Sequence, residues 1–186
     1  VGSGDVTRSL PGPYHYGDVV EFTAAANLGW NFSGWSGGIT GSSNPGTITV
    51  DGNEVITATF TQIEYTLTVH TNGEGLILLD NTGPYHYGDV VQITANPSSG
   101  WEFVDWQGDL TGSTNPNTIT INGNKDVTAN FNQINYTLTV LTDGNGTAVV
   151  NTPGPYHYHD MVVLTAYPDP GWRFVRWTGD REGTAN

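Results

Sequence analysis

Apolar and polar residues alternate along several short segments of this chain, and the alternation predicts β-strands. Residues 65–69 read Tyr-Thr-Leu-Thr-Val, and residues 136–140 repeat the same five letters. A period of two with threonine outward is typical of a half-buried strand. An Asn-Gly pair at 72–73 and an Asp-Gly pair at 143–144 follow these segments. Because both residue types tolerate positive φ, each pair predicts a hairpin to a second strand, which in the first case lies near Leu76–Leu79.

The pattern continues with four more predicted strands. The fourth begins at a Gly-Trp pair, as in Gly100–Phe103, and a last hairpin joins Thr118–Ile121 through a turn at 122–124 to Val127–Phe131. About six short strands per unit and no amphipathic helix predict a mainly β protein. The third strand has alternate apolar positions that should face inward, namely Val20, Phe22, Ala24, Val91, Ile93, Ala95, Val162, Leu164 and Ala166.

The whole pattern repeats without a gap. The segment Gly-Pro-Tyr-His-Tyr starts at Gly12 and returns at Gly83 and Gly154, a period of 71 residues. A fixed period of this length indicates tandem copies of one small domain. We predict copy 1 at residues 1–63 without its first strand, a complete copy 2 at residues 64–134, and copy 3 at residues 135–186 without its last hairpin.

The junctions between copies are short. Residues 61–64 and 132–135 connect one copy to the next with no Gly/Ser-rich or Pro-rich stretch. Flexible linkers usually have such compositions, so the copies should be joined stiffly. The predicted fold is therefore an elongated array of small antiparallel β domains, each β-grasp-like or a small sandwich.

Composition excludes several classes of function. The chain has 18 acidic and 5 basic residues, a net charge of −13 and a single lysine. Without a basic patch, binding to nucleic acid or to an anionic membrane surface is not expected. The absence of cysteine excludes disulfides, thiolate metal sites and cysteine nucleophiles. No run of about 18 apolar residues occurs, so no membrane insertion of this segment is expected.

Aromatic residues are the main candidates for ligand contact. The Trp-x-Phe-x-x-Trp set, as in Trp30 to Trp35, favours a core role because small β domains need bulky fillers, although exposed rings would form a sugar-binding platform. The Tyr-His-Tyr segment follows a proline at a predicted domain edge and is the candidate ligand-binding surface. It comprises Tyr14, His15, Tyr16, Tyr85, His86, Tyr87, Tyr156, His157 and Tyr158.

Metal and catalytic chemistry have weak support. The repeated histidines lie far apart in sequence, and the pair His157 and His159 beside Asp160 has no evident third ligand, so no metal site is predicted. Calcium stays open, because loop carboxylates occur at Asp18, Asp89, Asp109, Asp160 and Asp180, but no calcium-loop motif is present.

A nucleophile pattern, Gly-x-Ser-x-Gly, occurs at residues 34–38. It needs a strand-to-helix turn, and no helix is predicted there. We therefore expect no catalytic residues, no enzyme activity and no cofactor.

Two further sets of residues vary between copies. Glu102 and Asp105 of copy 2 correspond to Arg173 and Arg176 of copy 3, which suggests a contact between copies or between molecules through opposite charge. Asn31, Asn135 and Asn145 head Asn-x-Ser/Thr sequences and are possible glycosylation sites, although their counterparts in other copies are not.

The order of these segments resembles the internalin B-repeat superfamily, in its divergent branch. The matching pieces in copy 2 are Tyr65–Val69, Gly88–Val91, Gly100–Trp106 and Thr128–Phe131. The resemblance implies a β-grasp-like domain found in tandem on secreted and cell-surface proteins of prokaryotes. It implies spacer, adhesive or partner-binding roles and no catalytic residues.

These observations favour a non-enzymatic structural or adhesive segment outside the cell or at its surface. It would act as a stiff stalk or a filament-forming array, with neighbouring repeats or copies of itself as partners. One alternative is a module that binds surface polysaccharide or a host or cell receptor through the Tyr-His-Tyr edge. Another is an accessory segment of a larger secreted enzyme.

Overall fold

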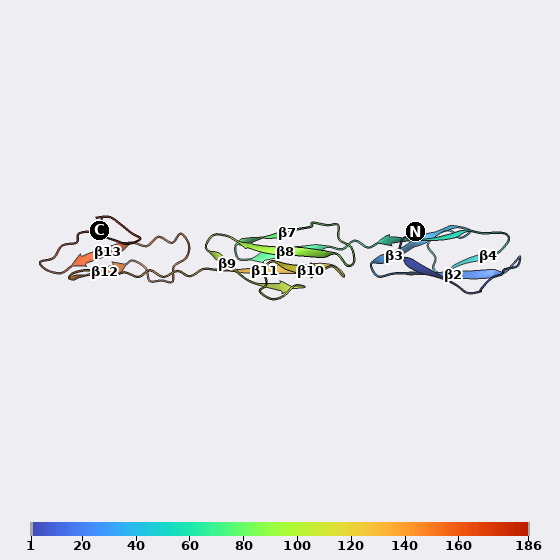
Figure 1. Ribbon diagram of the computed structural model, residues 1–186, viewed down its shortest axis with the longest axis horizontal. Helices are drawn as coiled ribbons and strands as arrows, with labels where there is room; N and C mark the ends of the chain where they lie inside the picture. Colours follow the sequence, from blue (N-terminus) through green and yellow to red (C-terminus); the bar gives the residue numbers. More distant parts are fainter. Residues whose placement is uncertain (1, 186) are drawn as a thin grey trace.

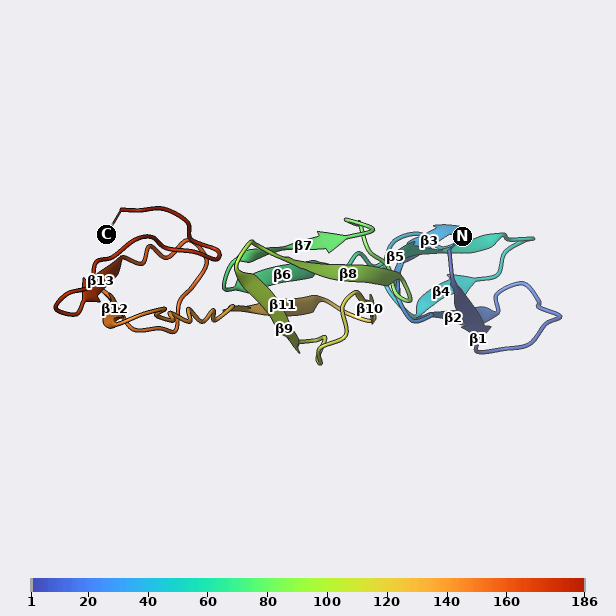
Figure 2. The ribbon, with the colours of Figure 1, turned by 60° about the vertical axis from the view of Figure 1, so that its left-hand side comes forward.

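The computed structural model describes residues 2–185, which form three bodies that follow one another along one axis (Figure 1, Figure 2). Strands, turns and loops make up this described part, and no helix occurs in it. The predicted mainly β class and elongated array are confirmed.

Copy 2 forms a small sandwich, which is one of the two expected architectures. It has six strands, as predicted, in two three-stranded sheets of order β10-β8-β7 and β6-β11-β9. Buried side chains from both sheets make one hydrophobic cluster between them. The strands are β6 (Leu67–Asn72), β7 (Gly75–Leu79), β8 (Val90–Pro97), β9 (Trp101–Gly108), β10 (Asn117–Thr120) and β11 (Lys125–Gln133).

Two of the predicted hairpins are wrong. The turn at 72–73 joins β6 to β7, and the turn at 122–124 joins β10 to β11, but each pair of strands lies in different sheets. The positive φ of Gly73 allows the chain to reverse sharply, yet it does not decide which strand becomes the partner. Both turns cross from one layer to the other, so that the apolar sides of both strands reach the shared core.

Strand β11 is the centre of its sheet. It pairs in parallel with β6 and antiparallel with β9, so the first and last strands of the repeat are neighbours. Its sequence alternates, and Val127, Ala129 and Phe131 all point into the core and are buried. The parallel β6–β11 pair departs from the all-antiparallel arrangement that the sequence suggested.

The second tryptophan of the Trp-x-Phe-x-x-Trp set is a core residue in copies 1 and 2. Trp106 is 1% exposed and its indole N–H donates to the Thr114 carbonyl at 2.9 Å. Trp35 is also buried, and it donates to the Ser43 carbonyl at 2.9 Å. The core interpretation is thus confirmed for these two rings.

Copies 1 and 3 contain subsets of the same strands. In copy 1 the sheets are β1-β2-β4 and β3-β5, and in copy 3 a single pair, β12-β13, forms. Residues 136–140 of copy 3 have the sequence of residues 65–69 but lie outside any strand apart from a bridge at Tyr136. The strands are β1 (Gly4–Arg8), β2 (Val19–Ala26), β3 (Trp30–Gly37), β4 (Gly46–Thr49), β5 (Ile56–Gln62), β12 (Gly146–Val150) and β13 (Leu164–Pro168).

An asparagine side chain continues the β8 ladder beyond the end of β10. The Asn115 amide accepts the Ala95 N–H at 2.9 Å and donates to the Ala95 carbonyl at 2.7 Å. Asn44 makes the same two bonds to Ala24 in copy 1, at 2.9 and 2.7 Å. Each amide therefore satisfies both backbone groups of a buried alanine that has no strand on that side.

We expect Asn115→Ala to lower the free energy of unfolding of copy 2 by about 2–3 kcal/mol, because two buried backbone groups lose their partners. Asn96→Ala, at an exposed position of the same strand, should cost less than about 0.5 kcal/mol. Urea unfolding followed by tryptophan emission, with hydrogen exchange at the Ala95 amide, measures both. Equal midpoints for the two variants would contradict the assigned role of the amide.

Candidate functional site at the joint between repeats

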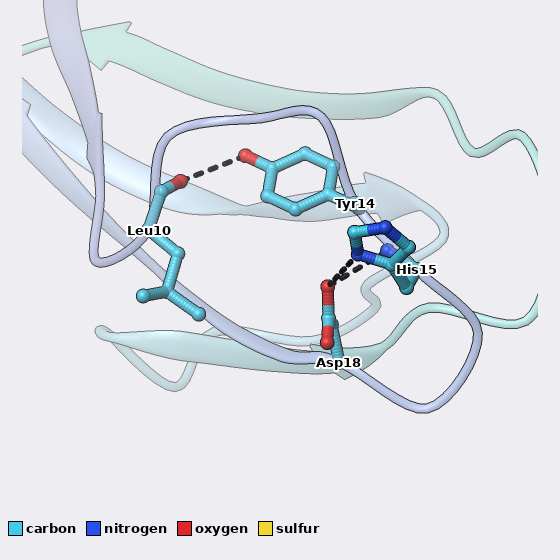
Figure 3. Close-up of polar contacts among 4 residues, drawn as sticks. All are labelled: Leu10, Tyr14, His15 and Asp18. Carbon is cyan, nitrogen blue, oxygen red and sulfur yellow. Dashed lines mark hydrogen bonds and ion pairs between the residues drawn. The ribbon is translucent and has the colours of Figure 1, made fainter.

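The first tyrosine of each Tyr-His-Tyr segment closes the end of its own copy. The Tyr85 ring is 4% exposed, and its hydroxyl donates to the Asn81 carbonyl at 2.7 Å. Tyr14 donates in the same way to the Leu10 carbonyl at 2.9 Å (Figure 3). Tyr156 donates to the carbonyl of the residue four positions before it at 2.8 Å. The hydroxyl of the first tyrosine is thus used within the copy.

Burial of Tyr85 has an electrostatic consequence. Desolvation, and secondly the negative charge of Asp80, raise the pKa of the Tyr85 phenol above its ordinary value. Both effects disfavour the phenolate. At neutral pH the phenol therefore keeps its proton and serves as a hydrogen-bond donor to Asn81.

The histidine belongs to a turn that is built around an aspartate. The His15 backbone N–H donates to Asp18 Oδ2 at 2.7 Å, and the same oxygen lies 3.8 Å from His15 Nδ1 (Figure 3). The turn recurs with N–H donor distances of 2.8 and 2.7 Å at the pairs His86–Asp89 and His157–Asp160.

The three aspartates of these turns are among the candidate calcium ligands, and each one accepts a backbone N–H within its turn. Calcium binding stays a prediction. Within residues 2–185 no three metal-binding side chains converge. Copy 3 differs at one turn position, because His159 stands where the other copies have Gly17 and Gly88. His159 takes a positive φ of 68°, and its ring contacts the Tyr158 ring.

The second tyrosine packs against the preceding copy. Tyr87 lies directly on Gly29 of copy 1, and Tyr158 lies on Gly100 of copy 2, so closely that a β-carbon at either glycine would collide with the tyrosine side chain. Tyr16 is 87% exposed, whereas Tyr87 and Tyr158 are 43% and 52% exposed. The exposed fraction is lower at Tyr87 and Tyr158 because the preceding copy covers part of each side chain.

The histidines show the same coverage. The His15 side chain is 84% exposed, whereas those of His86 and His157 are 29% and 35% exposed. Exposure of the aspartates hardly differs, at 38% for both Asp18 and Asp89. Contact between copies therefore involves the histidine and second tyrosine, and the aspartate remains on the outside.

Backbone hydrogen bonds hold almost every residue of the covalent link beside this contact. Ile63 N–H donates to the Gly29 carbonyl of copy 1 at 2.8 Å, and Tyr65 N–H donates to the Tyr85 carbonyl of copy 2 at 2.8 Å, so only Glu64 lies between. The second joint repeats this with Ile134 to Gly100 at 2.8 Å and Tyr136 to Tyr156 at 2.7 Å. Each joint thus has two attachments, the link and the tyrosine–glycine contact.

The charged residues expected between copies lie in β9 of copy 2 and in the corresponding segment of copy 3. Asp105 accepts a hydrogen bond from the Asn130 amide at 2.6 Å within copy 2, and Glu102 is exposed. Arg173 and Arg176 line an open groove in copy 3. In the described part of the chain, no ion pair joins these acids to these arginines. A contact through these charges between neighbouring molecules stays a prediction.

The possible glycosylation sites are exposed. Asn31 lies in β3, Asn135 is the single free residue of the second joint, and Asn145 lies in the turn before β12. Their modification stays a prediction. In the region the structure describes, no helix has the length and hydropathy that would span a membrane.

Sequence reasoning missed the two glycines of the joints. Gly29 and Gly100 were assigned only to the start of a strand, although each has a positive φ, of 77° and 80°. The Gly-Trp pair in all three copies was the available signal. It could not show that the space beside the glycine is filled by another copy.

Comparison with known proteins gives one match. A family model described as "Divergent InlB B-repeat domain" matches residues 1–64, 65–135 and 136–186. No curated protein and no solved structure matches the chain.

We expect Gly100→Ala to lower the free energy of unfolding for two reasons, because the backbone has a positive φ and because the added β-carbon collides with Tyr158. In Gly171→Ala only the positive φ should be unfavourable. Gly171 has a similar φ of 87° and open space around it. Gly171→Ala should therefore lower the free energy of unfolding by about 1 kcal/mol. In a double-mutant cycle by urea unfolding, Gly100→Ala should couple to Tyr158→Gly by about 1–3 kcal/mol. A coupling free energy of zero would mean that Tyr158 does not pack against Gly100.

Proposed function

The chain belongs to the divergent InlB B-repeat family, a family of repeat modules of surface proteins, and we propose that its copies act as a stiff, non-enzymatic spacer. In this role it holds other parts of a secreted or cell-surface protein at a distance. The observation that carries the proposal is the two-attachment joint, which occurs in the same form between copies 1 and 2 and between copies 2 and 3.

Two attachments make a joint resist bending. A single flexible link lets one domain swing in a cone, and the amplitude grows with the number of free residues. Here one residue is free at each link, and the tyrosine–glycine contact holds the copies at a second place. Because the same joint recurs, each added copy extends the array in a regular way.

The charge of the chain supports the same role. A net charge of −13 with a single lysine disfavours folding of the array back on itself, since like charges repel. It also favours solubility of an extended molecule that exposes much of its surface. This repulsion is screened by salt, so the joints must supply most of the stiffness at physiological ionic strength.

The same contacts favour a spacer over an edge that binds polysaccharide or a receptor. A stacking platform needs exposed rings with free hydroxyl neighbours. The hydroxyl of the first tyrosine donates a hydrogen bond to a backbone carbonyl of its own copy. The second tyrosine of copies 2 and 3 is partly covered by the preceding copy. A spacer also suits an accessory segment of a larger protein.

Replacement of a joint tyrosine should loosen one joint without unfolding either copy. The chain has no cysteine, so spin labels can be placed at Glu21→Cys in β2 and Gln92→Cys in β8, which are equivalent exposed positions of copies 1 and 2. We expect a narrow distance distribution by pulsed dipolar EPR. Tyr87→Ser should widen it roughly twofold, because one attachment is lost.

Tyr16→Ser is the matched control. It changes the same position of the repeat where no preceding copy is in contact, so the distribution should stay narrow. A broad distribution in the unchanged chain, or equal widths for the two variants, would argue against the spacer.

A further inference from the structure

Strand β7 is a free edge of copy 2. It is the outermost strand of the sheet β10-β8-β7, and it lies at the rim of the copy (Figure 1). Copy 2 contains all six strands, so this edge is a feature of the filled sandwich. An edge strand presents a row of unpaired backbone N–H and C=O groups, which another strand can satisfy.

The hydrogen bonds to the β8 side show which backbone groups are unpaired. The Glu74 carbonyl accepts a backbone N–H at 3.1 Å, and the Asp80 N–H donates to a backbone carbonyl at 3.2 Å, both on this side. Backbone groups alternate in direction along an antiparallel strand, so those of Gly75, Ile77 and Leu79 point away from β8. Opposite the first of these three residues β8 has a proline, which has no N–H to offer. Within residues 2–185, no strand lies on the outer side of β7.

Two leucines and two acids lie at alternate exposed positions of this edge. Leu76 and Leu78 are 64% and 53% exposed. Glu74 and Asp80 stand at the two ends of the strand and are exposed as well. Because side chains two positions apart share a face, the order along this face is acidic, apolar, apolar, acidic.

The other copies have different residues at these four positions. The leucines and acids of copy 2 are replaced by small polar residues in most cases, and both leucines occur together in copy 2 alone. The counterparts of the leucines are Asp5, Thr7, Thr147 and Val149, and those of the acids are Ser3, Ser9, Asn145 and Asn151.

The fold does not need the two negative charges. Asp80 Oδ1 accepts a backbone N–H of β8 at 2.9 Å, and Ser9 Oγ and Asn151 Oδ1 accept the equivalent N–H at 2.9 and 2.8 Å. A neutral oxygen therefore serves as well as a carboxylate at this place. Glu74 contributes its backbone carbonyl, as Ser3 does at 3.2 Å in copy 1. The charges and the leucines are thus available to a partner.

We propose that the free edge of β7 binds an extended peptide segment that has two apolar side chains at alternate positions and a basic residue two positions beyond each of them. The segment adds a fourth strand to the sheet, antiparallel to β7, and exchanges hydrogen bonds with Gly75, Ile77 and Leu79. Its apolar side chains lie opposite Leu76 and Leu78, and its basic side chains lie opposite the two acids. Main-chain hydrogen bonds give affinity, and the side chains give specificity. This interaction surface goes beyond the spacer role.

Charge favours a basic segment over a second copy of this chain. Opposite charges on neighbouring strands stabilise a pair, and like charges directly opposite destabilise it. If two β7 strands paired around Ile77, Leu76 would meet Leu78, but Glu74 would meet Asp80 at both ends. The net charge of −13 adds repulsion between two chains and attraction for a basic segment.

The test uses the full chain and synthetic peptides with blocked ends, followed by residue-resolved hydrogen exchange at physiological salt. The basic peptide is Lys-Thr-Val-Thr-Val-Thr-Lys, whose sequence is the same in both directions. At millimolar concentration it should slow exchange at the amides of Gly75, Ile77 and Leu79. Exchange at Leu76 and Leu78, whose amides face β8, should not change. The acidic peptide, with glutamate in place of both lysines, should bind roughly 5- to 100-fold more weakly.

Matched variants isolate the two acids. Glu74→Gln with Asp80→Asn removes both charges and keeps the side-chain oxygen that accepts the β8 N–H. The two peptides should then bind equally, to within about twofold. Asp51→Asn with Glu54→Gln makes the same change in net charge at an exposed turn of copy 1, and it should preserve the preference for the basic peptide. A basic peptide with valine at its second and sixth positions turns these side chains to the other face and should bind more weakly than the first.

Unchanged exchange at the three amides with millimolar basic peptide would overturn the site, and so would equal protection of the β1 edge of copy 1. A preference for the basic peptide that survives removal of the two acids would overturn their role. If protection of the same amides rises with protein concentration in the absence of peptide, a second copy occupies the edge and the proposed basic partner is wrong. None of these outcomes depends on whether the array is stiff.

Discussion

The repeat depends on one strand, β11, which joins its beginning to its end. Hydrogen bonds from β11 reach β6 on one side and β9 on the other, and its inward side chains complete the core. The dependence is visible in copy 3. Residues 136–140 there have the same five amino acids as residues 65–69, yet they form no strand where the described chain offers no counterpart of β11. Alternation makes a segment fit a sheet, but a neighbour is needed before it becomes one.

The sequence was a good guide to the strands and a poor guide to their partners. Inward positions such as Val91 and Ile93 could be predicted because the side-chain period of two is local. Pairing is not local, and a turn such as that at Gly73 serves a hairpin and a crossover between layers equally well. The joints were harder still to predict. Tyr85 and Tyr87 are the same residue type two positions apart, and only the fold shows that one closes its own copy while the other contacts the preceding copy.

The joint explains how a domain this small can be used in series. About 71 residues bury a limited core, and each copy gains additional covered surface from its neighbour. The Tyr-His-Tyr segment contributes both to the core of its own copy and to the contact with the preceding copy, within three residues. Its first tyrosine belongs to the core, and its histidine and second tyrosine lie at the boundary, where the preceding copy offers a glycine turn. The cost of a side chain at that glycine therefore has two parts, the positive φ within its own copy and the collision with the tyrosine of the neighbouring copy.

The parallel pairing of β6 with β11 determines how the molecule would behave under tension. Parallel neighbours start at the same end of a sheet, so the chain enters a repeat at the start of β6 and leaves it from the far end of β11. Each copy therefore advances the chain by its full length, whereas antiparallel first and last strands would return the chain to its point of entry. A pulling force on the two ends of a repeat acts along these strands in opposite directions. The force shears the hydrogen-bond ladder between β6 and β11. The hydrogen bonds are therefore loaded together and do not break one after another.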